Sequence, residues 1–200
     1  KNRSKIQKKI DEGWTPNFLE ETKKIRENRW KISAIPKDLL DRRVEITAPP
    51  AKKMIINALN SGANTFMADF EDSLSPTWIN LMNGQFYLKQ ANSREIDFTA
   101  EQSGKEYKLN NKIAVLIVRP RGWHLEEKNF LQYEKSTSAS LFDFALYFYN
   151  NYKVLIGKNS APYFYLPKIE NHLEAKLWEE VLTFTEEKFN LKKGTIKVTV

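Results

Sequence analysis

Short apolar runs that end in charged residues constrain the fold of this chain more than any other feature. The two clearest are Thr65–Ala68, which is followed by Asp69, and Ile113–Val118, which is followed by Arg119. A continuously apolar strand is buried on both faces, as in parallel sheets that helices cover on each side. Further strands are predicted over residues 44–47, 163–166 and from 195 onward.

Helical patterns separate these runs, so the sequence predicts the α/β class, with right-handed crossovers between parallel strands. Helices are expected over residues 52–60, 75–82, 140–149 and 172–189. In the last helix, the residues expected to face the sheet are Leu173, Leu177, Trp178, Val181, Leu182 and Phe184. Residues 83–112 contain two glycines and short alternating patches, and we interpret them as a small excursion from the main fold.

The number of strands indicates an incomplete barrel. Five strands are fewer than the roughly eight that close a (β/α)8 barrel, and the fifth is still running at Val200. We therefore expect these residues to be part of a longer polypeptide. At the other end, residues 1–30 are polar with a narrow apolar stripe. This pattern predicts a pair of helices, interrupted near Gly13, whose apolar stripe packs on a larger part of the structure.

Composition excludes several classes of protein. No apolar run approaches the roughly 20 residues of a membrane span, and residues 1–5 lack the apolar part of a signal peptide, so no membrane association is expected. The absence of cysteine excludes disulfides, thiolate chemistry and cysteine-bound metals. The net charge of +7 is spread along the chain without a long basic block, which argues against nucleic-acid binding but suits anionic substrates.

The charged residues that follow the two clearest strands are the candidate site. The first strand leads into the acidic segment 69–73, and the second leads into Arg119–His124. Ligands of parallel α/β folds bind just beyond the carboxyl ends of the strands. Carboxylates and a guanidinium at one rim therefore predict a site for a metal ion and an anionic oxygen.

Five motifs in this order resemble malate synthases of the A type. They are Asp41–Thr47, Met67–Ser73, Arg119–Leu125, Ser140–Phe144 and Pro162–Lys168, and the similarity runs from about Asp11 to Val200. Five ordered motifs are far more specific than one. Ala48 and Pro50 depart from the pattern expected of the family, which puts the geometry of that loop in question but not the resemblance.

The resemblance implies a fold and an activity. The fold would be a TIM barrel of which about five strands are present, with an N-terminal helical clasp at 1–40 and the first part of the barrel at 41–200. The full-length enzyme would be a cytoplasmic acyltransferase of the glyoxylate bypass, linked to the tricarboxylic acid cycle. It would use Mg²⁺ to condense acetyl-CoA with glyoxylate and water, giving malate and CoA. This portion alone is expected to be inactive, and its oligomeric state is left open, with a monomer as one option.

The resemblance also assigns roles to residues of the two rim segments. Arg119 would be catalytic, because a fixed cation stabilises the negative charge that develops on the thioester oxygen. Ser73 resembles a family position that contacts acetyl-CoA, and we expect Arg121 to contact CoA or the neighbouring loop, so both are candidate substrate-binding residues. Simpler interpretations are an ion pair of Arg119 with a barrel carboxylate, a helix cap at Ser73 and a rim salt bridge at Arg121.

The three acidic residues are expected beside the metal rather than on it. Asp69, Glu71 and Asp72 carry the hard oxygen atoms that hold the waters of Mg²⁺, whereas the direct ligands are expected after Val200. The alternative for these carboxylates is helix capping and pairing with Arg119. The two histidines, His124 and His172, lack the converging partners of a metal site.

Three other functions stay open at this point. One is a CoA-thioester lyase of the citrate-lyase β-subunit type, which shares the acidic end of the second strand and the arginine of the third. Another is a non-catalytic module that binds CoA. A basic nucleic-acid binder is the third, and it would bind duplexes with a steep dependence on salt.

Overall fold

The computed structural model describes residues 2–200, which form a compact unit ending at Ile35 and a second one from Pro36 to Val200. The first unit contains helix α1 (Asn2–Asp11), the short 3₁₀ helix η1 (Glu20–Thr22) and helix α2 (Lys23–Glu27). Its two α-helices are separated near Gly13, as the sequence predicts. No residue of α1 or α2 is buried, and their role as a clasp stays a prediction.

The second unit is built on one parallel sheet. Its five strands follow the order β1-β2-β5-β8-β9, which is their order along the chain. The strands are β1 (Glu45–Ala48), β2 (Thr65–Asp69), β5 (Val115–Arg119), β8 (Tyr163–Tyr165) and β9 (Lys197–Thr199). All four pairings are parallel. The predicted α/β class with five barrel strands is confirmed.

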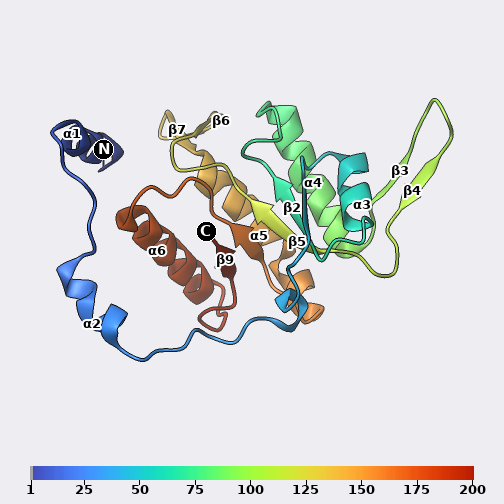
Figure 1. Ribbon diagram of the computed structural model, residues 1–200. Helices are drawn as coiled ribbons and strands as arrows, with labels where there is room; N and C mark the ends of the chain where they lie inside the picture. The colour runs from blue at the N-terminus through green and yellow to red at the C-terminus, as the bar shows by residue number, and fades with distance from the viewer. Residues whose placement is uncertain (1) are drawn as a thin grey trace. The chain divides into compact units, whose positions relative to one another are not determined.

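Helices connect these strands (Figure 1), and their buried residues form one core with one face of the sheet. These helices are α3 (Lys52–Leu59), α4 (Trp78–Ser93), α5 (Ala139–Gly157) and α6 (His172–Lys188), with a 3₁₀ turn η2 (Lys37–Leu39) before β1. The core between helices and sheet is rich in aromatic rings. For example, the ring centroid of Phe144 in α5 lies 4.9 Å from that of Phe164 in β8 and 5.6 Å from that of Trp178 in α6.

Helix α4 is longer than the predicted helix 75–82. It begins after Thr77, whose side chain accepts a hydrogen bond from the backbone N–H of Asn80, and it runs to Ser93. Gly84 argued against a helix there because glycine is a poor helix former. The structure gives the reason for this glycine, since a Cβ at residue 84 would lie 2.9 Å from both Phe70 and Pro50. Glycine thus allows the close approach of α4 to the sheet.

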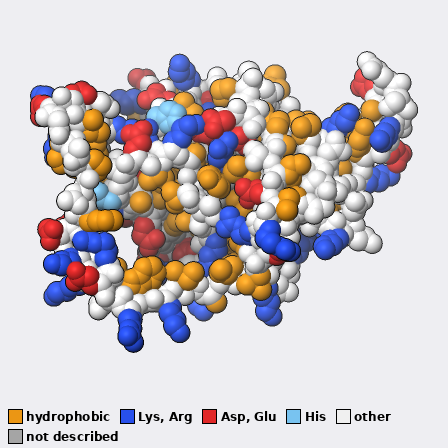
Figure 2. All heavy atoms as spheres, viewed as in Figure 1, with side chains coloured by type: hydrophobic (Ala, Val, Ile, Leu, Met, Phe, Trp, Pro, Cys, Tyr) orange, Lys and Arg blue, Asp and Glu red, His pale blue; other side chains and the backbone are white. Residues whose placement is uncertain are grey.

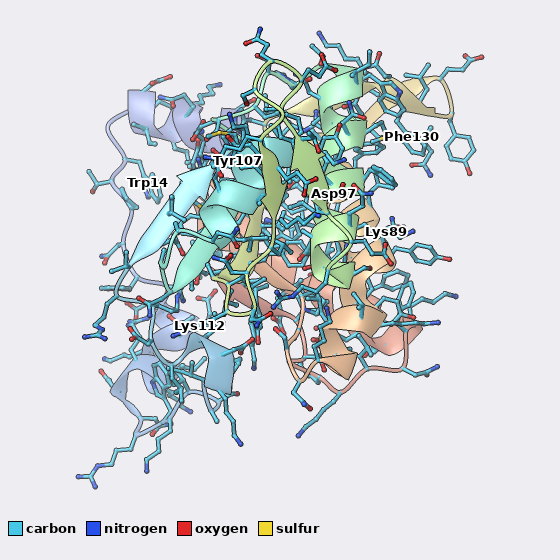
Figure 3. The ribbon with its side chains drawn as sticks, turned by 90° about the vertical axis from the view of Figure 1, so that its right-hand side faces the viewer. Trp14, Lys89, Asp97, Tyr107, Lys112 and Phe130 are labelled. Atoms are coloured by element: carbon cyan, nitrogen blue, oxygen red, sulfur yellow. The ribbon has the colours of Figure 1, made fainter. Side chains whose placement is uncertain are left out.

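Two antiparallel hairpins project from the parallel sheet. The first, β3 (Asp97–Thr99) with β4 (Glu106–Lys108), lies within the expected excursion. The second, β6 (Glu126–Gln132) with β7 (Lys135–Ser138), was not predicted, and Figure 3 shows Phe130 on it. Its strands are mostly exposed and therefore lack an apolar run. Its turn residues, Tyr133 and Glu134, both have positive φ without the Asn-Gly signature of such turns.

Helix α6 has a different inward face from the one predicted. Trp178 and Leu182 are buried as expected and Val181 is partly buried, but Leu173, Leu177 and Phe184 are exposed. Two acidic side chains, Glu174 and Glu186, are buried in their place. Both accept hydrogen bonds from the backbone of neighbouring loops. Glu174 accepts one from the N–H of Glu170, and Glu186 accepts two, from the N–H groups of Gly194 and Ile196. Hydrophobic spacing alone does not reveal such contacts.

No helix within residues 2–200 has the length and apolar character that crossing a membrane requires. Acidic and basic side chains are intermingled over the face of the molecule in Figure 2. On that face, the net positive charge of the chain does not gather into a single basic surface.

Candidate functional site

Asp69 and Arg119 form the centre of the predicted site. They end the neighbouring strands β2 and β5 and occupy the same register position. Arg119 donates from Nε to Oδ1 of Asp69 at 2.8 Å and from Nη2 to Oδ2 at 2.7 Å. Asp69 is fully buried, whereas the side chain of Arg119 is 17% exposed. The two strands therefore place a paired, partly accessible guanidinium at the carboxyl rim of the sheet.

The loop after β2 folds around the carboxylate of Asp69. Its Oδ1 accepts hydrogen bonds from the backbone N–H groups of Glu71 at 2.9 Å and Asp72 at 3.2 Å, and its Oδ2 accepts one from the hydroxyl of Ser73. Burial would raise the pKa of Asp69, but these bonds and those from Arg119 outweigh it and lower the pKa to about 2. Asp69 is thus an ionised anchor for both the loop and the arginine.

Glu71 joins three segments of the rim. Its side chain is 1% exposed, and its Oε1 accepts a hydrogen bond from Nζ of Lys168 at 3.0 Å, while Oε2 accepts one from the backbone N–H of Gly122. Nε2 of His124 lies 3.8 Å from the same Oε1. A Cβ at residue 122 would lie 2.8 Å from the His124 ring, so this packing requires glycine.

Asp72 lies between two cations. One of its oxygens is 3.2 Å from Nη2 of Arg119, and the other accepts a hydrogen bond from Nζ of Lys168 at 2.6 Å. Its side chain is 54% exposed, which makes it the accessible carboxylate of the predicted acid trio. The hydrogen bonds that Lys168 donates to Asp72 and Glu71 raise the pKa of this lysine. Its position just beyond the fourth predicted strand placed Lys168 at this rim, but its role could not be assigned from the sequence.

Arg121 lies on the buried side of the rim. Its side chain is 3% exposed and donates from Nε and Nη2 to Asp143 at 2.9 and 2.8 Å, and from Nη1 to Glu127 at 3.0 Å. Burial raises the pKa of Asp143 in spite of these bonds. Sequence reasoning missed both acidic partners, although a lone Asp143 inside a strongly apolar helix is a recognisable signal. Substrate binding by Arg121 stays a prediction.

A cavity of about 510 Å³ opens beside this ion-paired cluster. Its walls come from the loop before α4, from the loop after β5 and from β6, and they include Pro76, Arg121, His124, Leu125, Lys128 and Asn129. His124 contributes to this wall while it also contacts Glu71. The cavity therefore adjoins the segment that carries the predicted site.

The described residues do not form a metal site of their own. Within 2–200, no group of three or more histidine, aspartate or glutamate side chains is arranged to hold a metal ion. The oxygens of Asp69 and Glu71 already accept hydrogen bonds from cations and N–H groups. This donor set suits the predicted place beside a metal and does not suit direct coordination.

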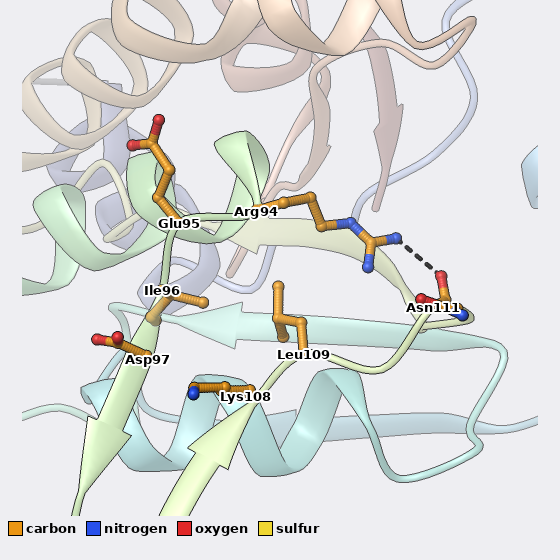
Figure 4. A pocket seen from close by; sticks show the side chains of 7 residues that line it. All are labelled: Arg94, Glu95, Ile96, Asp97, Lys108, Leu109 and Asn111. Carbon is orange, nitrogen blue, oxygen red and sulfur yellow. Dashed lines mark hydrogen bonds between the residues drawn. The ribbon is translucent and has the colours of Figure 1, made fainter.

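A second cavity, of about 560 Å³, lies between the end of α4 and the β3–β4 hairpin (Figure 4). Arg94 spans it and donates to the backbone carbonyls of Asn110 at 2.7 Å and Asn111 at 3.1 Å. Asp97 and Lys108 also line it. The predicted site residues take no part in this cavity, which is bounded by structural contacts of the hairpin.

Comparison with known proteins agrees with the resemblance seen in the motifs. The family model for the malate synthase TIM barrel domain matches residues 115–200. The chain is 52% identical over 198 residues to a malate synthase of Myxococcus xanthus, covering 99% of this chain and 36% of the relative. It is 52% identical over 194 residues to malate synthase A of Escherichia coli, covering 97% and 36%.

A third relative is the bifunctional glyoxylate cycle protein of Caenorhabditis elegans. It is 54% identical over 200 residues, which cover 99% of this chain and 21% of that protein. The similarity to malate synthases, which the motifs indicated, is confirmed. The chain spans about a third of the length of the malate synthases that it matches.

Proposed function

We infer that this chain, which is similar to malate synthases from end to end, is the part of such an enzyme that carries the first strands of its TIM barrel. The complete protein would condense acetyl-CoA with glyoxylate and water to give malate and CoA, as an acyltransferase of the glyoxylate bypass. The observation that carries this proposal is the ion-paired Arg119 at the carboxyl rim of the sheet, where barrel enzymes bind substrates.

Arg119 supplies the electrostatic part of the reaction in this proposal. Removing a proton from the methyl group of acetyl-CoA places negative charge on the thioester oxygen, and a fixed cation lowers the cost of that charge. The carboxylate of Asp69 holds the guanidinium plane through two hydrogen bonds and raises the pKa of Arg119. The arginine is therefore fixed and permanently charged before substrate arrives.

The other predicted residues support this centre. Ser73 lies in the loop that folds around Asp69 and donates its hydroxyl to that carboxylate, and its contact with acetyl-CoA is part of the proposal. Arg121 lines the 510 Å³ cavity, which is the proposed place for part of acetyl-CoA. The partly exposed guanidinium of Arg119 is the group of this rim that suits an anionic substrate.

Magnesium is the proposed metal, because Asp72 and its neighbours present hard oxygen atoms near the rim. When bound, Mg²⁺ would polarise the aldehyde of glyoxylate. We place Asp69, Glu71 and Asp72 beside the metal, where they orient Arg119 and the waters of the ion. The direct ligands are assigned to parts of the complete enzyme other than this chain.

The compartment is also part of the proposal. A cytoplasmic enzyme is expected from this sequence, whereas several relatives, such as the malate synthase of Gossypium hirsutum, are named glyoxysomal. The organelle of those relatives does not transfer to this chain, and fractionation of the source cells with an antibody to the complete protein would test the assignment.

The test of the activity uses the complete protein. Purified enzyme with Mg²⁺, acetyl-CoA and glyoxylate should release CoA, measured with a thiol reagent, and no release would contradict the proposal. Arg119→Ala should lower kcat by about 10²–10³-fold while the fold is retained. Arg43→Ala is the matched control, since Arg43 forms an exposed ion pair with Asp41. Cleavage of a hydroxyacyl-CoA thioester, without condensation, would favour the lyase alternative instead.

A further inference from the structure

We propose that Lys168 is a positioning residue of this site, which holds Glu71 and Asp72 in place relative to Arg119 by linking the end of β8 to the loop after β2. This inference rests on the proposed function and extends it to a residue with no role in the sequence analysis.

The contacts of Lys168 cross the rim of the sheet. Its ammonium lies 3.0 Å from Oε1 of Glu71 and 2.6 Å from Oδ1 of Asp72, which are more than ninety residues away in the chain. Glu71 is buried and Asp72 is half exposed, so the lysine bridges an interior and an accessible carboxylate. Charge-assisted hydrogen bonds of this kind fix the direction of both partners.

Asp72 is shared between the two cations of the site. Its other oxygen contacts Nη2 of Arg119 at 3.2 Å. The carboxylates of Asp69, Glu71 and Asp72 are thus held by the guanidinium of Arg119 and the ammonium of Lys168, and the His124 ring lies 3.8 Å from Glu71. Without the ammonium, Glu71 and Asp72 would repel each other and Asp72 would rely on Arg119 alone. The guanidinium would then be drawn away from the geometry that Asp69 sets.

The backbone of Lys168 supports a functional reason for this lysine. Its φ is +52°, in the left-handed region that residues with a Cβ rarely adopt. It directly follows Pro167, whose ring restricts the chain at the end of β8. A strained residue persists where the surrounding structure requires its side chain, and such residues cluster at functional sites. Glycine would suit this backbone better but would remove the ammonium from Glu71 and Asp72, and Asp72 would keep its contact with Arg119.

Replacement by glycine therefore separates the two effects. In the complete enzyme, Lys168→Gly relieves the strain of the positive φ but takes the ammonium away from the buried Glu71, so its Tm should fall less than that of Lys168→Met, which keeps the strain. Its kcat should nevertheless fall by about 10²-fold, as expected when a catalytic group is displaced by about 1 Å. The KM for acetyl-CoA should change little, since the lysine acts through Arg119. Lys168→Arg should recover part of the kcat, because it restores a cation at the same place.

The control is Lys193→Met, which removes a lysine from an exposed ion pair with Glu179 and should leave kcat unchanged. Lys168→Met and Asp72→Asn should be non-additive in a double-mutant cycle, because both changes break the same contact. Parental kcat in Lys168→Gly, or strict additivity in the cycle, would overturn the inference. A parent enzyme without CoA release would instead contradict the proposed function, so the two failures are distinguishable.

Discussion

Asp69 and Arg119 face each other at one register position of β2 and β5, and two hydrogen bonds of 2.8 and 2.7 Å join them. An ion pair and a catalytic role had been alternatives for this arginine. The geometry makes them compatible, because the pair fixes the guanidinium at a rim where its side chain stays 17% exposed. Removing the carboxylate should therefore affect the chemistry as well as the stability.

Asp69→Asn should lower kcat in the complete enzyme. The amide keeps the shape of the side chain but loses its charge, and its nitrogen cannot accept the hydrogen bonds that the carboxylate oxygens now accept from Arg119 and Ser73. Breaking a buried ion pair from one side costs about 3–5 kcal/mol in the free energy of unfolding. Urea denaturation and steady-state kinetics measure the two effects. Wild-type kcat in a folded variant would show that the pair is purely structural.

Acid should weaken the fold through the same residue. The pKa of Asp69 is lowered to about 2 from 3.8 for the free side chain, so its contribution to stability is complete above about pH 4. It should be lost as the pH falls from 3.8 towards 2, where the folded form also takes up the proton. Urea denaturation of the parent and of Asp69→Asn, between pH 5 and pH 2.5, measures this loss of stability. The range is chosen around the two pKa values. The difference between the two proteins should shrink on acidification.

Gly122→Ala should disturb the rim without removing a charge. The added methyl group would lie 2.8 Å from the His124 ring and 3.3 Å from Oε1 of Glu71, so the contact of Glu71 with the backbone of residue 122 must shift. We expect reduced kcat. Gly157→Ala is the matched control, because a Cβ there meets open space at the end of α5. It should stabilise the protein by up to about 1 kcal/mol.

Arg121→Met should destabilise strongly. It leaves two buried carboxylates, Asp143 and Glu127, without the guanidinium that neutralises them. The expected loss is about 3–5 kcal/mol in the free energy of unfolding, measured by denaturant titration of the complete protein. Arg43→Met removes a solvent-exposed arginine from its pair with Asp41 and should change the free energy of unfolding little, because water screens an exposed pair. Equal effects of the two changes would contradict the structural role given to Arg121.

The cap of helix α4 provides a smaller test. Thr77 accepts a hydrogen bond from the N–H of Asn80, whereas the helix predicted over residues 75–82 would begin at Ser75. Thr77→Ala should lower the free energy of unfolding by about 1 kcal/mol. Ser75→Ala should have a smaller effect, and the reverse order in denaturant titrations would restore the original assignment.

The sequence predicted the parts of this fold that depend on burial. Strand β2 has the predicted bounds and β5 was placed within two residues, because apolar residues on both faces leave an unbroken signal. The same logic placed Asp69 and Arg119 together, since parallel strands end at a common rim. The β6–β7 hairpin escaped prediction because its strands are exposed and its turn lacks glycine.

The site was predictable only at the level of residue type. Neither Lys168 nor Asp143 and Glu127 carries a periodic signal, because their partners are distant in the chain and meet only after folding. The prediction of which face of α6 is buried was partly wrong for a related reason, since Glu186 faces inward and accepts hydrogen bonds from the backbone of residues 194 and 196. Hydrophobic periodicity describes burial, whereas these contacts depend on tertiary geometry.

The guanidinium of Arg121 ties together the end of β5, the strand β6 and the start of α5. Replacing only one of Arg121, Asp143 and Glu127 would leave an unpaired charge in the interior. We therefore expect these three positions to change together during evolution. Among homologues we expect Arg121, Asp143 and Glu127 to be retained or replaced jointly, with uncharged residues of similar volume as the permitted substitutes. Such covariation would show that the charges of these three buried side chains must balance, which conservation at one position alone would not show.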